Sequence, residues 1–222
     1  MSAKSTIEHV VLREFRPEDI PEMVQVLAQT WDFGDFADDR GLRACQESYL
    51  LKNAHLATEV IVAEKDSVLL GYLFGRIPVR ALHPQHGFFE KAYANALKDW
   101  EIFATPQERQ KFEDDWMWVQ QWYAEQYKAL GAMAQTASHM DLFMVAKTAR
   151  GLGVGTLLFN EYKRRHLAHN AGRSVLLQTD TWCGWRFYEK KGFERLAMCP
   201  ALADETGSDD AQQAYFVYGG RF

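Results

Sequence analysis

The chain has 222 residues, of which 47% are hydrophobic, and a net charge of −5 at pH 7. This is enough apolar material for a sizeable core in one domain, or in one domain with an insertion, and the acidic balance gives little support to a nucleic-acid partner. The sequence contains no run of about 18 apolar residues and no charged-then-apolar leader pattern, so we expect no membrane association. The three cysteines, Cys45, Cys183 and Cys199, form no CxxC pair, which favours a reducing cytoplasm over a disulfide scaffold.

The first part of the chain predicts strands and helices in alternation. HVVLREFRPEDIPEMVQVLAQTW (9–31) is typical of a strand, a turn and an amphipathic helix, and residues 42–55 give a second helical pattern. TEVIVAEKDSVLLGYLFGRI (58–77) consists of two β-rich runs separated by four polar residues. This pattern predicts an antiparallel hairpin.

Residues 84–135 contain no strand signal and predict two helices. Thr105-Pro106-Gln107-Glu108 is a capping box with proline at the first helical position, so the second helix should begin there. The main apolar stripe of this helix leaves out Trp118 and Trp122. The segment could pack on the sheet as a helical hairpin, line a pocket or form a homodimer contact; our hypothesis is that at least one of the two tryptophans binds the acceptor substrate.

The last part of the chain predicts a strand (HMDLFMVA), a glycine-rich turn, a helix to about residue 169, a strand (SVLLQTD), a short helix (WRFYEKKGF) and a final strand (AYFVYG). Residues 203–212 predict a surface loop. Together the elements indicate a mixed α/β sheet flanked by helices, in a single domain of residues 1–222 with a helical insertion at about 84–135.

The glycines of ARGLGVGTLL lie where a strand should turn into a helix. The first turn of a helix has backbone amides without intrahelical partners, and glycine lets an anion approach them, so the pattern predicts a phosphate site. A Walker loop does not fit, because no lysine follows Gly155, and the GxGxxG dinucleotide pattern does not fit the observed GxGxG spacing. A third scheme, Arg/Gln-x-x-Gly-x-Gly/Ala, is satisfied by Arg150-Gly151-Leu152-Gly153-Val154-Gly155.

These motifs, in the order VAKTARGLGVGTLL, strand, FYEKKGF, resemble the GCN5-related N-acetyltransferase (GNAT) superfamily. The resemblance covers the order of elements over residues 10–77 and 139–222; residues 84–135 stand where members usually have a short connection. It implies a mostly antiparallel, splayed sheet and acetyl-CoA as co-substrate. Cofactor-binding residues implied in this way are Met144, Val145, Arg150, Gly151, Leu152, Gly153, Val154, Gly155, Thr156 and Thr181.

Acetyl transfer from a thioester to an amine needs a neutral amine, stabilisation of an oxyanion and a proton for the leaving thiolate. The backbone amide of Val145 suits the oxyanion, and the resemblance implies Tyr188 as the acid, although the ring could merely pack. Asp141 and Asp180 are the nearest carboxylates by position, and we take Asp141 as the candidate base. His83, His86, His166 and His169 have no metal-like set of partners, so no metal is expected.

The sequence therefore predicts an N-acetyltransferase that moves acetyl from acetyl-CoA to a primary amine of a small molecule by direct transfer in a ternary complex. A route through an acetylated Cys183 is a rival mechanism. A non-catalytic acyl-CoA-binding sensor or interaction protein with the same fold is the alternative function.

Overall fold

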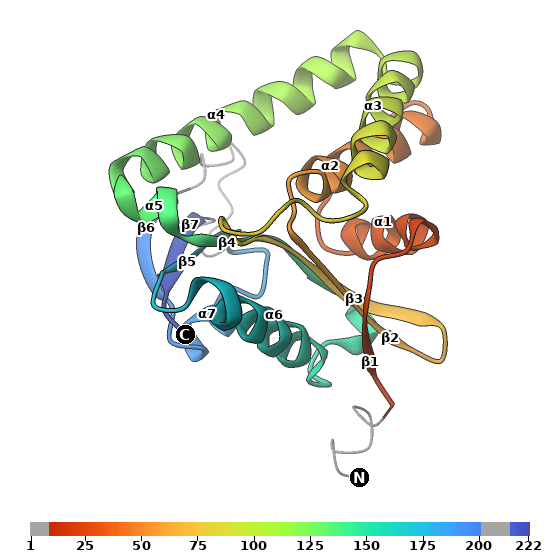
Figure 1. Ribbon diagram of the computed structural model, residues 1–222. Helices are drawn as coiled ribbons and strands as arrows, with labels where there is room; N and C mark the ends of the chain where they lie inside the picture. The colour runs from red at the N-terminus through yellow and green to blue at the C-terminus, as the bar shows by residue number, and fades with distance from the viewer. Residues whose placement is uncertain (1–8, 201–213) are drawn as a thin grey trace.

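The computed structural model describes residues 9–200 and 214–222, so the loop predicted at 203–212 lies outside the part described. Within these residues the strands form one seven-stranded sheet in the order β1-β2-β3-β4-β5-β7-β6. Every neighbouring pair is antiparallel except β4 and β5. Figure 1 shows α1, α2 and α3 on one side of this sheet and α6 on the other.

The first part of the chain forms the predicted strand, helices and hairpin. Its elements are β1 (Val11–Glu14), the 3-10 turn η2 (Pro17–Asp19), α1 (Ile20–Ala28), α2 (Asp39–Ala54), β2 (Glu59–Lys65) and β3 (Val68–Arg76). The hairpin turn is made by Asp66 and Ser67, whose φ angles of 50° and 62° are left-handed. Two such residues in succession give a turn whose twist matches that of the flanking strands.

The helices between β3 and β4 are α3 (His86–Phe103), α4 (Pro106–Leu130) and the short α5 (Ala132–Thr136). The first two are the helices that the sequence predicts. The capping box is present: the Thr105 side chain accepts from the Glu108 amide, and the Glu108 side chain accepts from the Thr105 amide. In Figure 1, α4 runs from the side of α2 and α3 across to the β5–β7 side of the sheet.

The second part of the chain contains one strand that the sequence analysis missed. Its elements are β4 (Ser138–Val145), η3 (Lys147–Ala149), α6 (Val154–Asn170), β5 (Val175–Asp180), α7 (Arg186–Lys190), β6 (Glu194–Pro200) and β7 (Ala214–Gly220). The missed strand is β6, at the edge of the sheet. Its side chains Leu196 and Met198 remain exposed, so it lacks the apolar-in, polar-out alternation that identifies a strand.

The sheet splits between β4 and β5. These parallel strands pair only over Ser138–Val175, His139–Leu176 and Met140–Leu177. Beyond those pairs β4 continues along β3, whereas β5 continues along β7. The predicted fold class, a mixed and mostly antiparallel splayed sheet flanked by helices, is confirmed.

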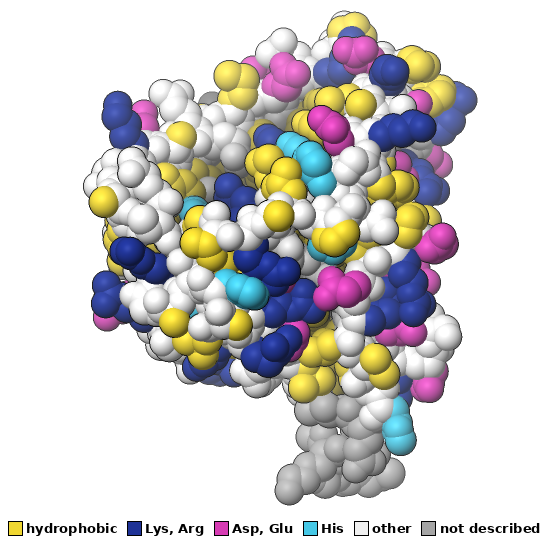
Figure 2. Space-filling model, viewed as in Figure 1, with side chains coloured by type: hydrophobic (Ala, Val, Ile, Leu, Met, Phe, Trp, Pro, Cys, Tyr) yellow, Lys and Arg dark blue, Asp and Glu magenta, His cyan; other side chains and the backbone are white. Residues whose placement is uncertain are grey.

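The next observations concern the side chains on the surface and the membrane-spanning potential of the helices. In the view of Figure 2, hydrophobic side chains are scattered over the face, and basic side chains gather where Figure 1 places α6, which carries Lys163, Arg164 and Arg165. None of the helices in the described ranges is long and apolar enough to span a membrane.

Candidate active site

A cavity of about 1010 Å³ opens where β4 and β5 separate. Its walls come from the free parts of β4 and β5, the glycine turn before α6, the start of α7, the segment 30–36, α2 and α4. The volume suits a site for one or two small ligands. Residues far apart in the sequence therefore meet at the split of the sheet.

The three glycines of the turn are required on different physical grounds. Gly151 and Gly153 have φ angles of 77° and 90°, a left-handed conformation that other residues adopt at a cost. Gly155 has no such angle, and a Cβ there would meet Val145 Cγ2 at 3.6 Å and Phe143 Cζ at 3.7 Å, which are ordinary contact distances. The fold therefore tolerates a side chain at Gly155, and close approach of a ligand is the reason that remains for glycine at this position.

The turn also presents unpaired amides. Gly153 is the N-cap of α6 and has no side chain with which to cap the helix. The first amides of α6 have no intrahelical acceptors and lie at the positive end of the helix dipole. Gly155 and Thr156 line the cavity, whereas Leu152 and Val154, which the sequence also nominates, contribute no side chain to its wall.

The edge of β4 offers its backbone to the split. The Ala146 amide donates to Leu70 O on the β3 side, and the direction of hydrogen bonding alternates along an antiparallel strand. The amide and carbonyl of Val145 therefore point away from β3, and Val145 O accepts from Arg150 Nε at 3.2 Å. By the same alternation Phe143 faces the split while the backbone of Met144 faces β3, so the structure favours Phe143 over Met144 as a backbone partner. The register of β4 against β3 decides this, and a single sequence does not reveal that register.

Tyr188 lies at the floor of the cavity. It is 9% exposed and packs among Phe143, Phe187, Phe193 and Tyr218. Its hydroxyl forms no hydrogen bond with any residue in the described ranges. Burial raises the pKa of this phenol above its usual value. The hydroxyl therefore stays protonated at neutral pH and has its hydrogen-bonding capacity unused.

The two carboxylates nominated by the sequence differ in their partners. Both oxygens of Asp141 are held by Arg76, at 2.8 Å from Nε and 2.7 Å from Nη2. Such a bidentate pair occupies both carboxylate oxygens of Asp141 and leaves neither free to contact an acceptor amine. Asp180 accepts from the Cys183 amide at 2.9 Å and, more weakly, from Trp31 Nε1 at 3.3 Å. Burial raises the pKa of Asp180, as expected for a carboxylate poised to exchange a proton.

Cys183 lines the cavity but lacks the features of a nucleophile. Burial, the largest cause, and the neighbouring Asp180 carboxylate raise the pKa of its thiol. The thiolate is the reactive form, so this environment disfavours an acetylated cysteine. The structure gives the mechanism through Cys183 no support.

Three of the four histidines named above are occupied in structural contacts, and the fourth, His169, is exposed at the end of α6. His83 Nδ1 accepts from the Gln85 amide at 3.1 Å, His86 Nδ1 lies 2.7 Å from His55 O, and His166 Nδ1 lies 2.9 Å from Ser138 Oγ. In residues 9–200 and 214–222 there is no group of three or more His, Cys, Asp or Glu side chains that could hold a metal.

Thr181 is used within the sheet rather than in the cavity. Its amide donates to Ala214 O at 3.0 Å, and its hydroxyl accepts from the Ala214 amide at 3.1 Å. The threonine is absent from the cavity wall. These bonds join the end of β5 to the start of β7, so the side chain is not available to a ligand in the way that the sequence predicted.

The structure does not bring Trp118 and Trp122 to the cavity. Trp118 lies edge-on to Tyr215 at 5.3 Å, and Trp122 packs against Tyr123 at 5.0 Å. The α4 side chains in the cavity wall include Phe112 and Trp116, together with Tyr123, whose hydroxyl donates to Thr179 O at 3.1 Å. These three belong to the main apolar stripe of the helix: Phe112 and Trp116 face Phe33 and Tyr49, and Tyr123 faces β5.

Comparisons with known proteins agree with this geometry. A split sheet whose glycine turn, free strand edge and buried tyrosine share one cavity defines an acetyltransferase fold. The family model described as the acetyltransferase (GNAT) domain matches residues 89–198, about half of the chain. The chain belongs to the GNAT superfamily, as the resemblance implied.

Solved structures show the same fold at low identity. Ard1 from Thermoplasma volcanium is 19% identical with a TM-score of 0.52, over 95% of this chain and 96% of that one. A histone acetyltransferase HPA2 and related acetyltransferase from Corynebacterium glutamicum is 15% identical with a TM-score of 0.55, over 96% of both chains. A ribosomal-protein-alanine N-acetyltransferase from Brucella melitensis is 13% identical with a TM-score of 0.51, over 96% of this chain and 99% of that one. The search of curated proteins gave no match.

Proposed function

We propose that the protein moves the acetyl group of acetyl-CoA to a primary amine of a small molecule, directly and within a ternary complex. One observation carries the proposal: the split of β4 and β5 gathers the amides at Gly155, the outward-facing backbone of Val145 and the unpaired hydroxyl of Tyr188 around a single cavity. Because Gly155 has no side chain, the pyrophosphate of CoA can approach the first amides of α6 closely. The free edge of β4 suits the pantetheine arm, which is rich in amide groups.

The residues of the cavity divide the chemistry among them. Asp180 takes a proton from the amine, because Asp141 is held by Arg76. The Val145 amide donates to the oxyanion that develops on the thioester carbonyl. Tyr188 gives its proton to the departing thiolate.

α4 supports a small acceptor over a large one. Near its start, Glu108 accepts from the Ala37 amide at 2.6 Å, and further along, Tyr123 donates to Thr179 O at 3.1 Å. The helix is thereby fastened to the segment between α1 and α2 and also to β5. Because α4 is fixed to both walls of the cavity, it limits the size of an acceptor that can enter.

The test is release of the CoA thiol from acetyl-CoA, with and without a panel of primary amines. We expect release that depends on the amine, together with an acetylated product detected by mass spectrometry. Tight CoA binding without amine-dependent release would contradict the proposal and favour the acyl-CoA sensor. Unchanged turnover in Cys183→Ala is expected for direct transfer.

A further inference from the structure

Five aromatic rings form a continuous cluster in the wall of the cavity. Trp31 and Phe33 precede α2, Tyr49 lies on α2, and Phe112 and Trp116 lie on α4; we call these five residues the aromatic cluster. Its centroid distances are 5.6 Å for Trp31–Tyr49, 5.7 Å for Phe33–Tyr49, 5.2 Å for Tyr49–Trp116, 6.3 Å for Phe33–Phe112 and 6.5 Å for Phe112–Trp116. All five line the cavity and are only partly buried.

The cluster begins next to the proposed base. Trp31 Nε1 lies 3.3 Å from Asp180 Oδ2, so an amine held by Asp180 has the rings as its next neighbours. The glycine turn and Tyr188 line the same cavity. The cluster is therefore placed to contact the part of the acceptor that does not react.

The charges beside the aromatic cluster nearly balance one another. Asp32 and Asp35 are exposed at the rim, and the exposed Lys52 and Lys111 line the same cavity. The carboxylate of Glu108 is already occupied by the Ala37 amide at 2.6 Å and by the amide and hydroxyl of Thr105 at 2.6 Å and 2.9 Å. The three carboxylates thus face two lysines, and the oxygens of Glu108 are already taken up by hydrogen bonds, so little charge is left to attract a second cation, whereas the ring faces and edges suit a flat apolar group.

We propose that the acceptor is an arylalkylamine, a primary amine joined by a short chain to an aromatic ring, and that Phe112 and Trp116 of α4 select it. The inference rests on the proposed function and adds the substrate class. The amine lies against Asp180, and the aromatic ring of the acceptor packs into the aromatic cluster. Two of the five rings come from α4, within residues 84–135. Substrate specificity is therefore determined by the segment that the resemblance to the GNAT superfamily does not cover.

The experiment compares acetylation of three probes: 2-phenylethylamine, 1,4-diaminobutane and a short peptide with a free N-terminus. The variants are Trp116→Ala, Trp116→Phe and Phe112→Ala. Met117→Ala is the matched control, because Met117 is the neighbour of Trp116 on the same helix and its side chain is 65% exposed. CoA affinity by calorimetry reports for each variant whether the cofactor half is intact.

We expect the wild-type protein to prefer 2-phenylethylamine. Trp116→Ala should raise the KM for this amine about tenfold or more, equivalent to about 1.4 kcal/mol, while Trp116→Phe recovers part of the loss. Met117→Ala and the CoA affinity should not change. If Trp116→Ala does not fold, Phe112→Ala and Trp116→Phe provide the same comparison.

Three results would overturn the inference. A wild-type preference for the diamine would indicate a second cation site, and a preference for the peptide would indicate a protein acceptor; in both cases the transferase function stands. An unchanged KM in Trp116→Ala and Phe112→Ala would remove the rings from the acceptor site. Acetylation of none of the probes, despite CoA binding, would instead overturn the transferase function and this inference with it.

Discussion

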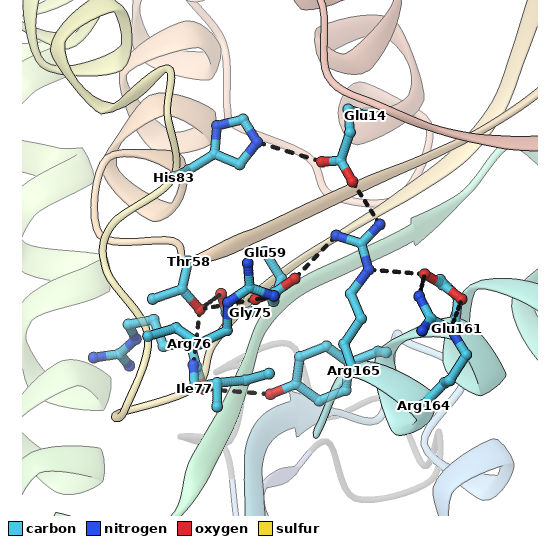
Figure 3. A network of polar contacts seen from close by, with 12 residues as sticks. Glu14, Thr58, Glu59, Gly75, Arg76, Ile77, His83, Glu161, Arg164 and Arg165 are labelled. Atoms are coloured by element: carbon cyan, nitrogen blue, oxygen red, sulfur yellow. Dashed lines mark hydrogen bonds and ion pairs between the residues drawn. The ribbon is translucent and has the colours of Figure 1, made fainter. Parts of the chain in front are cut away.

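The sheet contains two polar regions that differ in how completely their groups are paired. At the β1–β2 edge, Arg165 of α6 contacts Glu14 at 2.6 Å, Glu59 at 2.9 Å and Glu161 at 2.8 Å, and Arg80 also contacts Glu59 at 2.8 Å. Figure 3 shows Glu14 of β1, Glu59 of β2 and Glu161 of α6 converging on Arg165. Glu59 is completely buried, and both of its oxygens have an arginine partner.

Pairing in this network also controls its protonation. His83 points at Glu14 in Figure 3, with Nε2 at 3.5 Å from the carboxylate. The hydrogen bond from His83, followed by that from Arg165, lowers the pKa of Glu14 to about 2. A group fixed in one charge state over the whole neutral range is suited to holding elements together.

At the β4–β5 split the opposite holds. The Tyr188 hydroxyl has no hydrogen-bond partner among residues 9–200 and 214–222, Val145 faces the gap with its backbone amide, and burial raises the pKa of Asp180 rather than lowering it. The polar groups at the β1–β2 edge are thus saturated, whereas Tyr188, Val145 and Asp180 keep unused capacity where the sheet opens. We therefore expect substitutions in the network to change stability and substitutions at the split to change activity.

The largest expected effect is that of Tyr188→Phe. This change keeps the ring contacts and removes the proton for the thiolate, so kcat should fall about 10²- to 10⁴-fold with little change in CoA affinity. Single-turnover kinetics, in which chemistry is rate-limiting, are the measurement. Turnover near that of the wild type would remove Tyr188 from the chemistry.

Asp180→Asn should lower kcat/KM about 10²-fold or more by removing the base. The wild-type rate should also fall as pH drops through the pKa of Asp180, because the base acts only when deprotonated. Since burial raises that pKa, this acidic limb should lie above the ordinary range of aspartate, and the variant should lack it.

Asp141→Asn is the control for that comparison. It loses the ion pair with Arg76 but leaves Asp180 in place, so the acidic limb should persist in the folded protein. If the limb disappears in Asp141→Asn and persists in Asp180→Asn, the two carboxylates have been assigned the wrong roles.

Glu59→Gln should act on stability alone. It removes the buried carboxylate that Arg80 contacts and one of the three carboxylates that Arg165 contacts, and the free energy of unfolding should drop by about 3 kcal/mol. Glu47→Gln, which breaks the exposed pair with Arg43 on α2, should cost only about 0.5 kcal/mol. Urea unfolding measures both, and kcat of the folded Glu59→Gln protein should equal that of the wild type; a lowered kcat would mean that the two regions are coupled.

Glu108→Ala should have the smallest effect. Glu108 caps α4 and accepts from the Ala37 amide, so its loss frees the segment between α1 and α2 from the helix. We expect a few-fold rise in acceptor KM with unchanged CoA affinity. Glu113→Ala, which changes an exposed glutamate of the same helix, should leave the KM as it is, and equal effects of both would mean that helix charge, not the tether, is responsible.

Local signals predicted most of the fold. Apolar periodicity identified α1, α2, β2 and β3, and the Thr105 capping box identified the first residue of α4. The edge strand β6 escaped because Leu196 and Met198 are exposed, which removes the alternation on which a sequence-based prediction depends.

The candidate site could be predicted only in part, because its geometry is set by contacts across the chain. The glycine turn and Tyr188 are recognisable from local motifs. The partner of Asp141 is Arg76, 65 positions earlier, and no local pattern reveals that pair. The rotation of α4 that turns Trp116 toward the cavity and Trp118 toward Tyr215 likewise depends on packing against β7.

The central claim is that the glycine turn at the split binds the pyrophosphate of CoA, and Gly155 is the position at which to test it. A Cβ is tolerated there, and an acidic residue in the first turn is favourable for the helix itself. Gly155→Asp should therefore fold while repelling the ligand phosphates, and Gly155→Asn adds similar bulk without the charge.

The most direct measurement is calorimetric titration of CoA into the wild type, Gly155→Asn and Gly155→Asp, with circular dichroism to establish folding. We predict binding to the wild type, weaker binding to Gly155→Asn, and a loss of about tenfold or more in Gly155→Asp, equivalent to about 1.4 kcal/mol. Wild-type affinity in a folded Gly155→Asp protein would contradict the account.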